Sequence, residues 1–263
     1  MNWSKIARNI FIVMIVSFIL GFASAFWDIH LSPETWIVIF VLAFLILFGS
    51  GIYNLMNPTR FLSKGMYNKA IEEFNNIINK YKGNDRVMNA MNLNIASCYS
   101  RLGDFQRSIE YLDKIDSKTR AIDKNLTFAY SGLYVVNLML LDREYEKIEE
   151  HLKKVVEIND LIEFYPIRAY FEALKADEKK TLDYIEKYQN RKENRKFILS
   201  FMNTSLVFDK FTIDVENNFF IGMSYYKLND FKSAILYLSK IINYEYDNFY
   251  SRKAREILEE IKK

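Results

Sequence analysis

The 263-residue chain contains a single cysteine, Cys98, and two histidines, His30 and His151. A single cysteine cannot form an internal disulfide, so no disulfide framework stabilises the fold. So few nitrogen and sulfur ligands also exclude a zinc site of the Cys/His type. Glycine and proline are scarce, with 8 and 3 residues, and their scarcity favours long helices over a turn-rich β structure.

A strong charge of either sign is absent as well, because 36 Lys and Arg residues stand against 33 Asp and Glu residues. The resulting net charge of +3 predicts neither a nucleic-acid-binding protein nor a surface that attracts acidic partners. Hydrophobic residues make up 50% of the chain, which is too many for an intrinsically disordered protein. We therefore expect a folded chain without a nucleic-acid partner.

The hydrophobic residues are concentrated in two uncharged runs near the N-terminus, residues 9–27 and residues 35–58. A helix of about 20 apolar residues spans the roughly 30 Å hydrocarbon core of a bilayer. A buried core helix is the alternative for each run, but such a helix usually keeps a polar edge and neither run has one. The pattern predicts a membrane anchor over residues 1–57, with transmembrane helices at about residues 9–27 and 36–56.

The first run also has the parts of a secretory signal peptide. Lys5 and Arg8 precede an apolar stretch at residues 10–22, and residues 23–25 have the small-x-small form of a cleavage site. The apolar character continues through Trp27, and a second apolar run follows almost at once. We therefore favour an uncleaved anchor, with cleavage as the alternative.

The basic residues beside the two runs predict the orientation of the anchor. Lys5 and Arg8 precede the first run, Arg60 and Lys64 follow the second, and the connecting residues 28–35 contain neither Lys nor Arg. Basic residues are enriched on the cytoplasmic side of membrane proteins. We therefore expect an integral protein of the cell membrane whose C-terminal part is in the cytoplasm, whether or not the first run is cleaved.

After the second run, three segments repeat one pattern of residue types, at residues 65–77, 103–115 and 229–241. In each segment a turn residue precedes an aromatic residue, a small residue follows, and two large apolar residues come next. The aromatic residues are Tyr67, Phe105 and Phe231, and the small residues are Ala70, Ser108 and Ala234. Two more small residues, Ala96 and Gly222, lie upstream of the second and third segments.

This pattern resembles the tetratricopeptide repeat, a unit of about 34 residues that folds as two antiparallel helices. The resemblance implies that the small residues let the two helices approach closely, and that successive pairs stack into a curved array. Residues 89–116 and 216–243 match the repeat best. Residues 143–148 resemble a degenerate turn, and residues 165–189 resemble an irregular helix pair that begins near Pro166.

The turns are spaced more widely than a regular array requires, which predicts insertions near residues 114–123 and 191–209. Residues 247–263 place apolar residues on one helical face and charged residues on the other, as expected for a capping helix. The predicted fold is therefore all-α. Two N-terminal transmembrane helices are followed, over residues 58–263, by an irregular tetratricopeptide-like α-solenoid of antiparallel helix pairs.

No group of residues has the pattern of a catalytic, cofactor-binding or metal site. His151 lies in a segment rich in Glu and Lys, so we interpret it as a solvated helix residue, and Cys98 as a small core residue. The densest basic stretch, residues 191–196, is interleaved with an acidic residue and is interpreted as a solvated insertion. Contact of this stretch with anionic lipid or nucleic acid is the alternative. We predict that the protein is not an enzyme and needs no cofactor.

The resemblance also implies a concave groove, lined by the first helix of each pair, that binds a protein or peptide partner. By alignment with the repeat, the groove residues are Leu93, Ser97, Ser100, Tyr130, Leu133, Asn137, Phe219, Met223 and Tyr226. Leu93 and Ser97 stand where the best-known members of the family use Lys and Asn to bind a terminal carboxylate. We therefore expect the groove to bind a helix or an extended apolar segment. Its residues Leu93, Tyr130, Leu133, Phe219 and Tyr226 should then be partly exposed, with burial between irregular repeats as the alternative.

These observations support two hypotheses. The first is a membrane-anchored adaptor that recruits a protein partner to the cytoplasmic surface of the membrane. The alternative is a structural subunit of a membrane complex that assembles through its transmembrane helices. A small-xxx-small spacing at Gly21 and Ala25 leaves homo-oligomer formation open.

Overall fold

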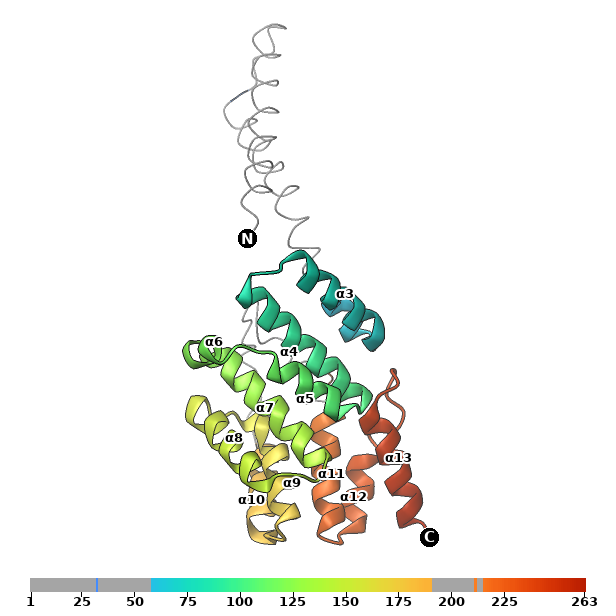
Figure 1. The fold of residues 1–263 in the computed structure, drawn as a ribbon. Helices are drawn as coiled ribbons and strands as arrows, with labels where there is room; N and C mark the ends of the chain where they lie inside the picture. Colours follow the sequence, from blue (N-terminus) through green and yellow to red (C-terminus); the bar gives the residue numbers. More distant parts are fainter. Residues whose placement is uncertain (1–31, 33–57, 191–210, 212–214) are drawn as a thin grey trace, which may run out of the picture.

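The computed structural model describes residues 58–190 and 215–263, together with residues 32 and 211. Both predicted transmembrane segments lie outside these residues. The described part of the chain is helical and has no β-strand, in agreement with the predicted all-α class (Figure 1). None of its helices is long and apolar enough to cross a membrane. Residues 58–63 are helical, and the labelled helices are α3 (Tyr67–Lys80), α4 (Asp85–Leu102), α5 (Phe105–Asp113), α6 (Ser117–Ile122), α7 (Lys124–Leu140), α8 (Tyr145–Ile158), the 3₁₀ helix η1 (Ile162–Phe164), α9 (Tyr165–Leu174), α10 (Glu178–Gln189), α11 (Asn217–Lys227), α12 (Phe231–Leu238) and α13 (Phe249–Ile261).

Most of these helices form hairpins that stack on one another (Figure 1). The pairs are α4 with α5, α7 with α8, α9 with α10, and α11 with α12. Helix α3 packs on α4 and belongs to a first, shortened pair. The short helix α6 occupies the insertion that was predicted at residues 114–123, and it buries none of its side chains. The second predicted insertion, at residues 191–209, lies in the part of the chain that the structure does not describe.

A local signal sets the turn in three of the hairpins. The first helix ends at a residue with positive φ, and the next residue is an aspartate whose carboxylate accepts a hydrogen bond from a backbone N–H three residues later. Such a residue pair ends one helix in the left-handed region and caps the N-terminus of the next. The pairs are Gly103 and Asp104 before α5, Ala176 and Asp177 before α10, and Asn229 and Asp230 before α12.

Small residues bring the two helices of a pair close together, as the repeat pattern predicts. A side chain at Gly222 in α11 would place its Cβ 2.7 Å from side-chain atoms of Leu238 in α12. In α5, Ser108 is fully buried and its hydroxyl donates a hydrogen bond of 2.7 Å to the carbonyl of Ala96 in α4. The residue that limits the space at Gly222 is therefore Leu238, one helical turn beyond Ala234.

The C-terminal part of the chain returns to the first repeats. A Cβ at Gly65 would lie 2.3 Å from the Cβ of Tyr246, and a Cβ at Gly103 would lie 2.7 Å from the ring of Phe249. The guanidinium of Arg252 donates a hydrogen bond of 2.9 Å to the carbonyl of Leu102 at the end of α4. We refer to residues 246–252 as the closing segment. Helix α13 thus does more than cap the array, because this segment joins its two ends (Figure 1).

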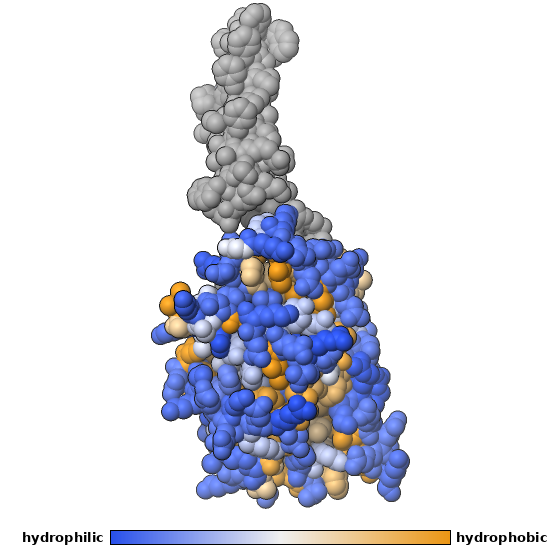
Figure 2. All heavy atoms as spheres, in the orientation of Figure 1, coloured by the Kyte–Doolittle hydropathy of each residue, from blue (hydrophilic) through white to orange (hydrophobic). Residues whose placement is uncertain are grey.

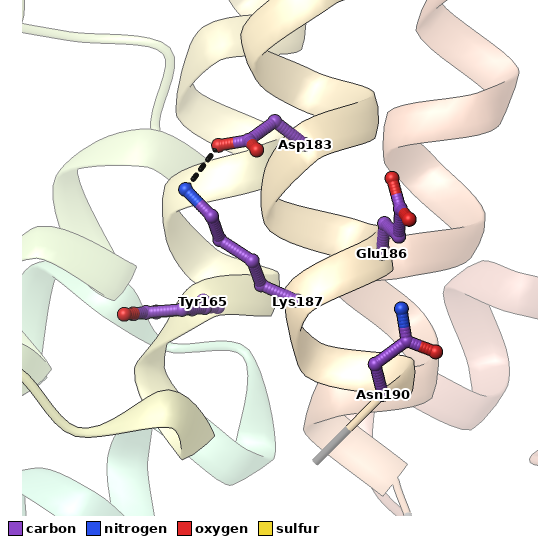
Figure 3. Close-up of a pocket in the computed structure, with 5 residues that line it drawn as sticks. All are labelled: Tyr165, Asp183, Glu186, Lys187 and Asn190. Atoms are coloured by element: carbon purple, nitrogen blue, oxygen red, sulfur yellow. Dashed lines mark hydrogen bonds and ion pairs between the residues drawn. The ribbon is translucent and has the colours of Figure 1, made fainter.

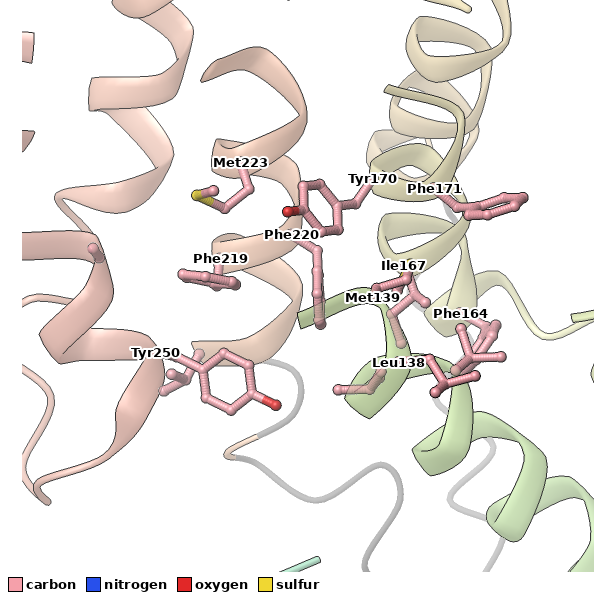
Figure 4. Packing of buried hydrophobic residues seen from close by; sticks show 14 of the residues in the cluster. Leu138, Met139, Phe164, Ile167, Tyr170, Phe171, Phe219, Phe220, Met223 and Tyr250 are labelled. Carbon is pink, nitrogen blue, oxygen red and sulfur yellow. The ribbon is translucent and has the colours of Figure 1, made fainter. Parts of the chain in front are cut away.

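The largest hydrophobic core contains side chains from α7, α8 and α9 and from α11, α12 and α13. Aromatic residues form much of it (Figure 4). Figure 2 shows one face of the domain, which is mostly hydrophilic. Hydrophobic residues are interspersed along the middle of this face. The closed arrangement therefore buries the inner surface that an open solenoid would present to a partner.

Candidate partner-binding groove

The residues predicted to line the groove lie on the first helices α4, α7 and α11, as expected. Their exposure differs from the prediction. Three of them, Ser97, Leu133 and Tyr226, are half-buried. The others are buried, namely Leu93, Ser100, Tyr130, Asn137, Phe219 and Met223. The expectation that Leu93, Tyr130 and Phe219 would be partly exposed is therefore wrong, and the reason differs from helix to helix.

Leu93 and Tyr130 are buried because the hairpin of α4 and α5 packs against the hairpin of α7 and α8. Both belong to a hydrophobic cluster that also contains Leu112 of α5. The guanidinium of Arg120 lies 4.1 Å from the ring centroid of Tyr130, and burial raises the pKa of the Tyr130 hydroxyl to about 12. These two side chains hold neighbouring hairpins together and present no binding face.

Asn137 is buried for the same reason. Its amide donates a hydrogen bond of 2.7 Å to the hydroxyl of Ser108, which in turn donates to the carbonyl of Ala96. The three residues come from α7, α5 and α4, so this chain of hydrogen bonds crosses the junction between two hairpins. The amide nitrogen of Asn137 is paired in this way, whereas its buried Oδ1 has no hydrogen-bond partner among the described residues.

Phe219 is buried because the C-terminal helix covers α11. Its ring centroid lies 5.2 Å from that of Tyr250 and 6.2 Å from that of Phe249, in edge-to-face arrangements (Figure 4). Both partners are residues of α13. Aromatic edge-to-face pairs add to the gain from burial, so α13 occupies the inner face of α11 as an intramolecular ligand would.

A buried charged group completes the interior, and sequence reasoning did not identify it. Arg101, at the end of α4, is 2% exposed, and its guanidinium lies 4.4 Å from the ring centroid of Phe211. Its Nε is 4.0 Å from a carboxylate oxygen of Glu216. Burial raises the pKa of the Tyr250 hydroxyl, and the nearby Glu216 carboxylate raises it further. Because Arg101 and Glu216 are far apart along the chain, no local sequence pattern predicts this ion pair.

His151 is also placed differently from the prediction. It is buried, its Nδ1 lies 3.2 Å from the hydroxyl of Ser131, and its ring stacks on Tyr134 at a centroid distance of 4.7 Å. Loss of hydration lowers its pKa to about 4, so the ring is neutral at pH 7. His151 is therefore a packing residue between α7 and α8, and its interpretation as a solvated residue is corrected. Cys98 is fully buried, as predicted, and burial raises the pKa of its thiol to about 12.

A polar surface depression lies between α9 and α10 (Figure 3). It is lined by Tyr165, Asp183, Glu186, Lys187 and Asn190. The ammonium of Lys187 lies 2.6 Å from a carboxylate oxygen of Asp183, so these two charges neutralise each other. Across the described residues, no group of three or more His, Cys, Asp and Glu side chains is arranged to hold a metal ion.

Comparison with known families agrees with this geometry. The family model named tetratricopeptide repeat matches residues 90–117 and 215–248. These two segments are tetratricopeptide repeats. The first contains most of α4 and all of α5, and the second contains α11, α12 and the turn that follows. No curated protein and no solved structure matches the chain.

The helix pairs α7–α8 and α9–α10 lie between the two tetratricopeptide repeats and outside the matched segments. The turn before α8 differs from the other turns, because both Asp142 and Glu144 have positive φ and Glu144 forms no side-chain cap. Ile148 in α8 is buried where the repeat has a small residue. Both pairs keep the hairpin architecture of the repeats, and α9–α10 also keeps their capped turn at Ala176 and Asp177.

Proposed function

We propose that this protein is an adaptor or scaffold that uses its tetratricopeptide repeats to bind a protein partner. The observation that carries the proposal is the array itself, in which the two matched repeats are joined through further helix pairs and the closing segment into one body. The polar interior residues serve this architecture, because Arg101, Asn137 and His151 each contact another side chain of the array. A rigid helical body with structural polar contacts is suited to presenting surfaces to a partner.

We further propose that the adaptor is attached to the membrane by residues 1–57. The proposal is supported by the two uncharged runs in the sequence and by the basic residues on their outer flanks. It is also supported by the start of the helical domain, where Pro58 is buried and Leu62 is packed in the core with α3 and α4. An anchor would therefore be joined to the domain directly. On this proposal the repeats face the cytoplasm.

Topology reporters test the attachment. A reporter that is active only in the cytoplasm should be active when it is fused after Lys263 of the full chain. A reporter that is active only outside the cytoplasm should be active when it is inserted near Ser32. Extraction of membranes at alkaline pH should leave the full chain in the membrane fraction. A chain that alkaline extraction releases, or the opposite pattern of reporter activities, would overturn the proposed attachment.

The structural-subunit hypothesis differs in what holds the partner. Residues 1–57 can be replaced by an unrelated anchor of two transmembrane helices, so that residues 58–263 stay at the same membrane. Cross-linking in cells, followed by purification of the tagged chain, then compares the partners of the two proteins. An adaptor should keep its partner after the exchange, and a subunit that assembles through its own transmembrane helices should lose it.

A further inference from the structure

Helix α12 differs from the other second helices in what it leaves at the surface. It buries the side chains of Ala234 and Leu238 only. Phe231 is 43% exposed, Ile235 is 40% exposed and Leu236 is 59% exposed. Phe231 and Ile235 are four positions apart, so they lie side by side on one face, and Leu236 lies on the adjoining outer face. These three side chains form an exposed apolar strip that extends about 8 Å along the helix axis, the rise of five residues.

The matching helix of the first repeat indicates what normally covers such a strip. Phe105 stands at the position of Phe231 and is buried, with its ring edge-to-face to Phe249 at a centroid distance of 4.8 Å. Ile109 stands at the position of Ile235 and is half-buried in the main core. Helix α5 is covered by other helices, α7 among them. On α12, by contrast, Phe231 and Ile235 remain exposed although α13 packs beside this helix (Figure 1).

Two lysines lie beside the strip. Lys232 and Lys240 are exposed, and the ammonium of Lys240 lies 4.3 Å from the ring centroid of Tyr237. No salt bridge of either lysine with a carboxylate is found among the described residues. On α10, by contrast, Lys187 is paired with Asp183 of the same helix. The nearest acidic residue along the chain is Asp230, whose carboxylate already accepts a hydrogen bond from the N–H of Ser233. Helix α12 itself contains no acidic residue.

We propose that this surface, which consists of Phe231, Lys232, Ile235, Leu236 and Lys240, binds an amphipathic helix of a partner protein whose apolar face is flanked by acidic residues. The proposal deepens the adaptor function and rests on it. A helix is the expected occupant because helices cover the equivalent face of α5. Acidic flanks are expected because carboxylates would pair with the two exposed lysines at either end of the strip.

The position of α12 favours a protein over a lipid surface. In Figure 1, α12 lies on the side of the domain opposite to α3 and to the start of the described domain at residue 58. If residues 1–57 are the membrane anchor, the membrane is at the α3 end. The apolar strip would then face the cytoplasm, where a protein helix can reach it.

Binding can be measured with the full chain, in a nanodisc of zwitterionic lipid, and three fluorescent helical peptides. The peptides share one apolar stripe at positions i, i+3, i+4 and i+7, and their flanks carry Glu, Lys or Gln. We expect the Glu-flanked peptide to bind about tenfold more tightly than the Lys-flanked one. Leu236→Ala with Ile235→Ala should weaken its binding about tenfold. Lys232→Glu with Lys240→Glu should reverse the preference, so that the Lys-flanked peptide binds better.

A matched control reverses two exposed lysines elsewhere, with Lys118→Glu and Lys124→Glu, and should leave the affinities within about twofold. Circular dichroism verifies that each variant is folded. Equal binding of all three peptides, no binding, or binding that the α12 variants do not change would overturn the proposal. So would binding of vesicles of phosphatidylcholine and phosphatidylglycerol that the α12 variants abolish, because the surface would then be a lipid-binding one. A partner that still cross-links to the α12 variants would leave the adaptor function standing and refute this docking surface alone.

Discussion

The two tetratricopeptide repeats have the same local structure and different surroundings. In both, an aspartate caps the second helix, a small residue of the first helix allows close packing, and an aromatic residue follows the turn. Yet Phe105 is buried in the first repeat, and its equivalent Phe231 is 43% exposed in the second. The repeat pattern thus determines how each hairpin folds. The helices that pack around a hairpin determine which of its side chains remain available to a partner.

Truncation of the two equivalent phenylalanines tests this comparison most strongly. Phe105→Ala should lower the free energy of unfolding by about 3 kcal/mol, because it leaves a cavity beside Phe249 and the closing segment. Phe231→Ala should lower it by less than about 1 kcal/mol, because this ring is already in contact with solvent. Chemical denaturation of both variants measures the difference. Similar losses would show that the two repeats are covered alike.

Substitution of the close-contact residue tests the internal packing of the second repeat. Gly222→Leu should destabilise the protein by about 2 kcal/mol or more, because Leu238 leaves no space for a side chain. The control is Gly83→Ala, at a loop residue beside which the structure has free space. Because Gly83 has a positive φ, alanine there is expected to strain the backbone, but its Cβ would not overlap with any neighbouring atom. A Gly222→Leu variant with unchanged stability would mean that α11 and α12 are not in close contact.

The pH dependence of stability tests the packing of α8 against α7. The folded-state pKa of His151 is lowered to about 4, so the folded protein favours the neutral ring. The unfolded chain takes up a proton at its ordinary pKa of about 6.5. The contribution of His151 to stability is therefore complete above pH 6.5 and decreases as the pH falls toward about 4. His151→Gln should flatten this decrease in denaturation experiments between these pH values. A parallel decrease in both proteins would contradict the buried position of His151.

The smallest expected effect concerns the turns. Ala176 has φ +58° at the position that Gly103 occupies before α5. A side chain in this region costs roughly 1–2 kcal/mol, and the greater freedom of glycine in the unfolded chain costs about 0.4–1 kcal/mol. Ala176→Gly should therefore raise the free energy of unfolding by about 0.5 kcal/mol. A lower midpoint of thermal unfolding would argue against a left-handed turn at this residue.

Much of the architecture could be predicted from residue patterns because its determinants are local. The turn at Gly103 and Asp104, and the one at Asn229 and Asp230, are each encoded within a few residues. The irregular helix pair at residues 165–189, with Pro166 near its start, could also be predicted, although the family model does not match it. The transmembrane segments stay a prediction from the sequence, since they lie outside the described residues.

The candidate groove could be assigned to the correct helices but not to the surface. Alignment places Leu93, Tyr130 and Phe219 on the inner faces of α4, α7 and α11, and this placement agrees with the structure. Whether an inner face is open depends on contacts between residues far apart in the chain. Gly103 with Phe249 is one such contact, and the sequence pattern of either residue contains no information about the other.

The sequence by itself thus determined the helices, the capped turns and the close packing within each repeat, because these depend on residues a few positions apart. Only the tertiary structure decided that the array closes on itself. Closure joins Arg101 to Glu216 and buries Phe219 under α13, and both contacts connect residues that are adjacent only after folding. Burial of Phe105 against Phe249, and exposure of the equivalent Phe231, are likewise decided by packing between segments that are distant in the chain, which no local pattern could have revealed.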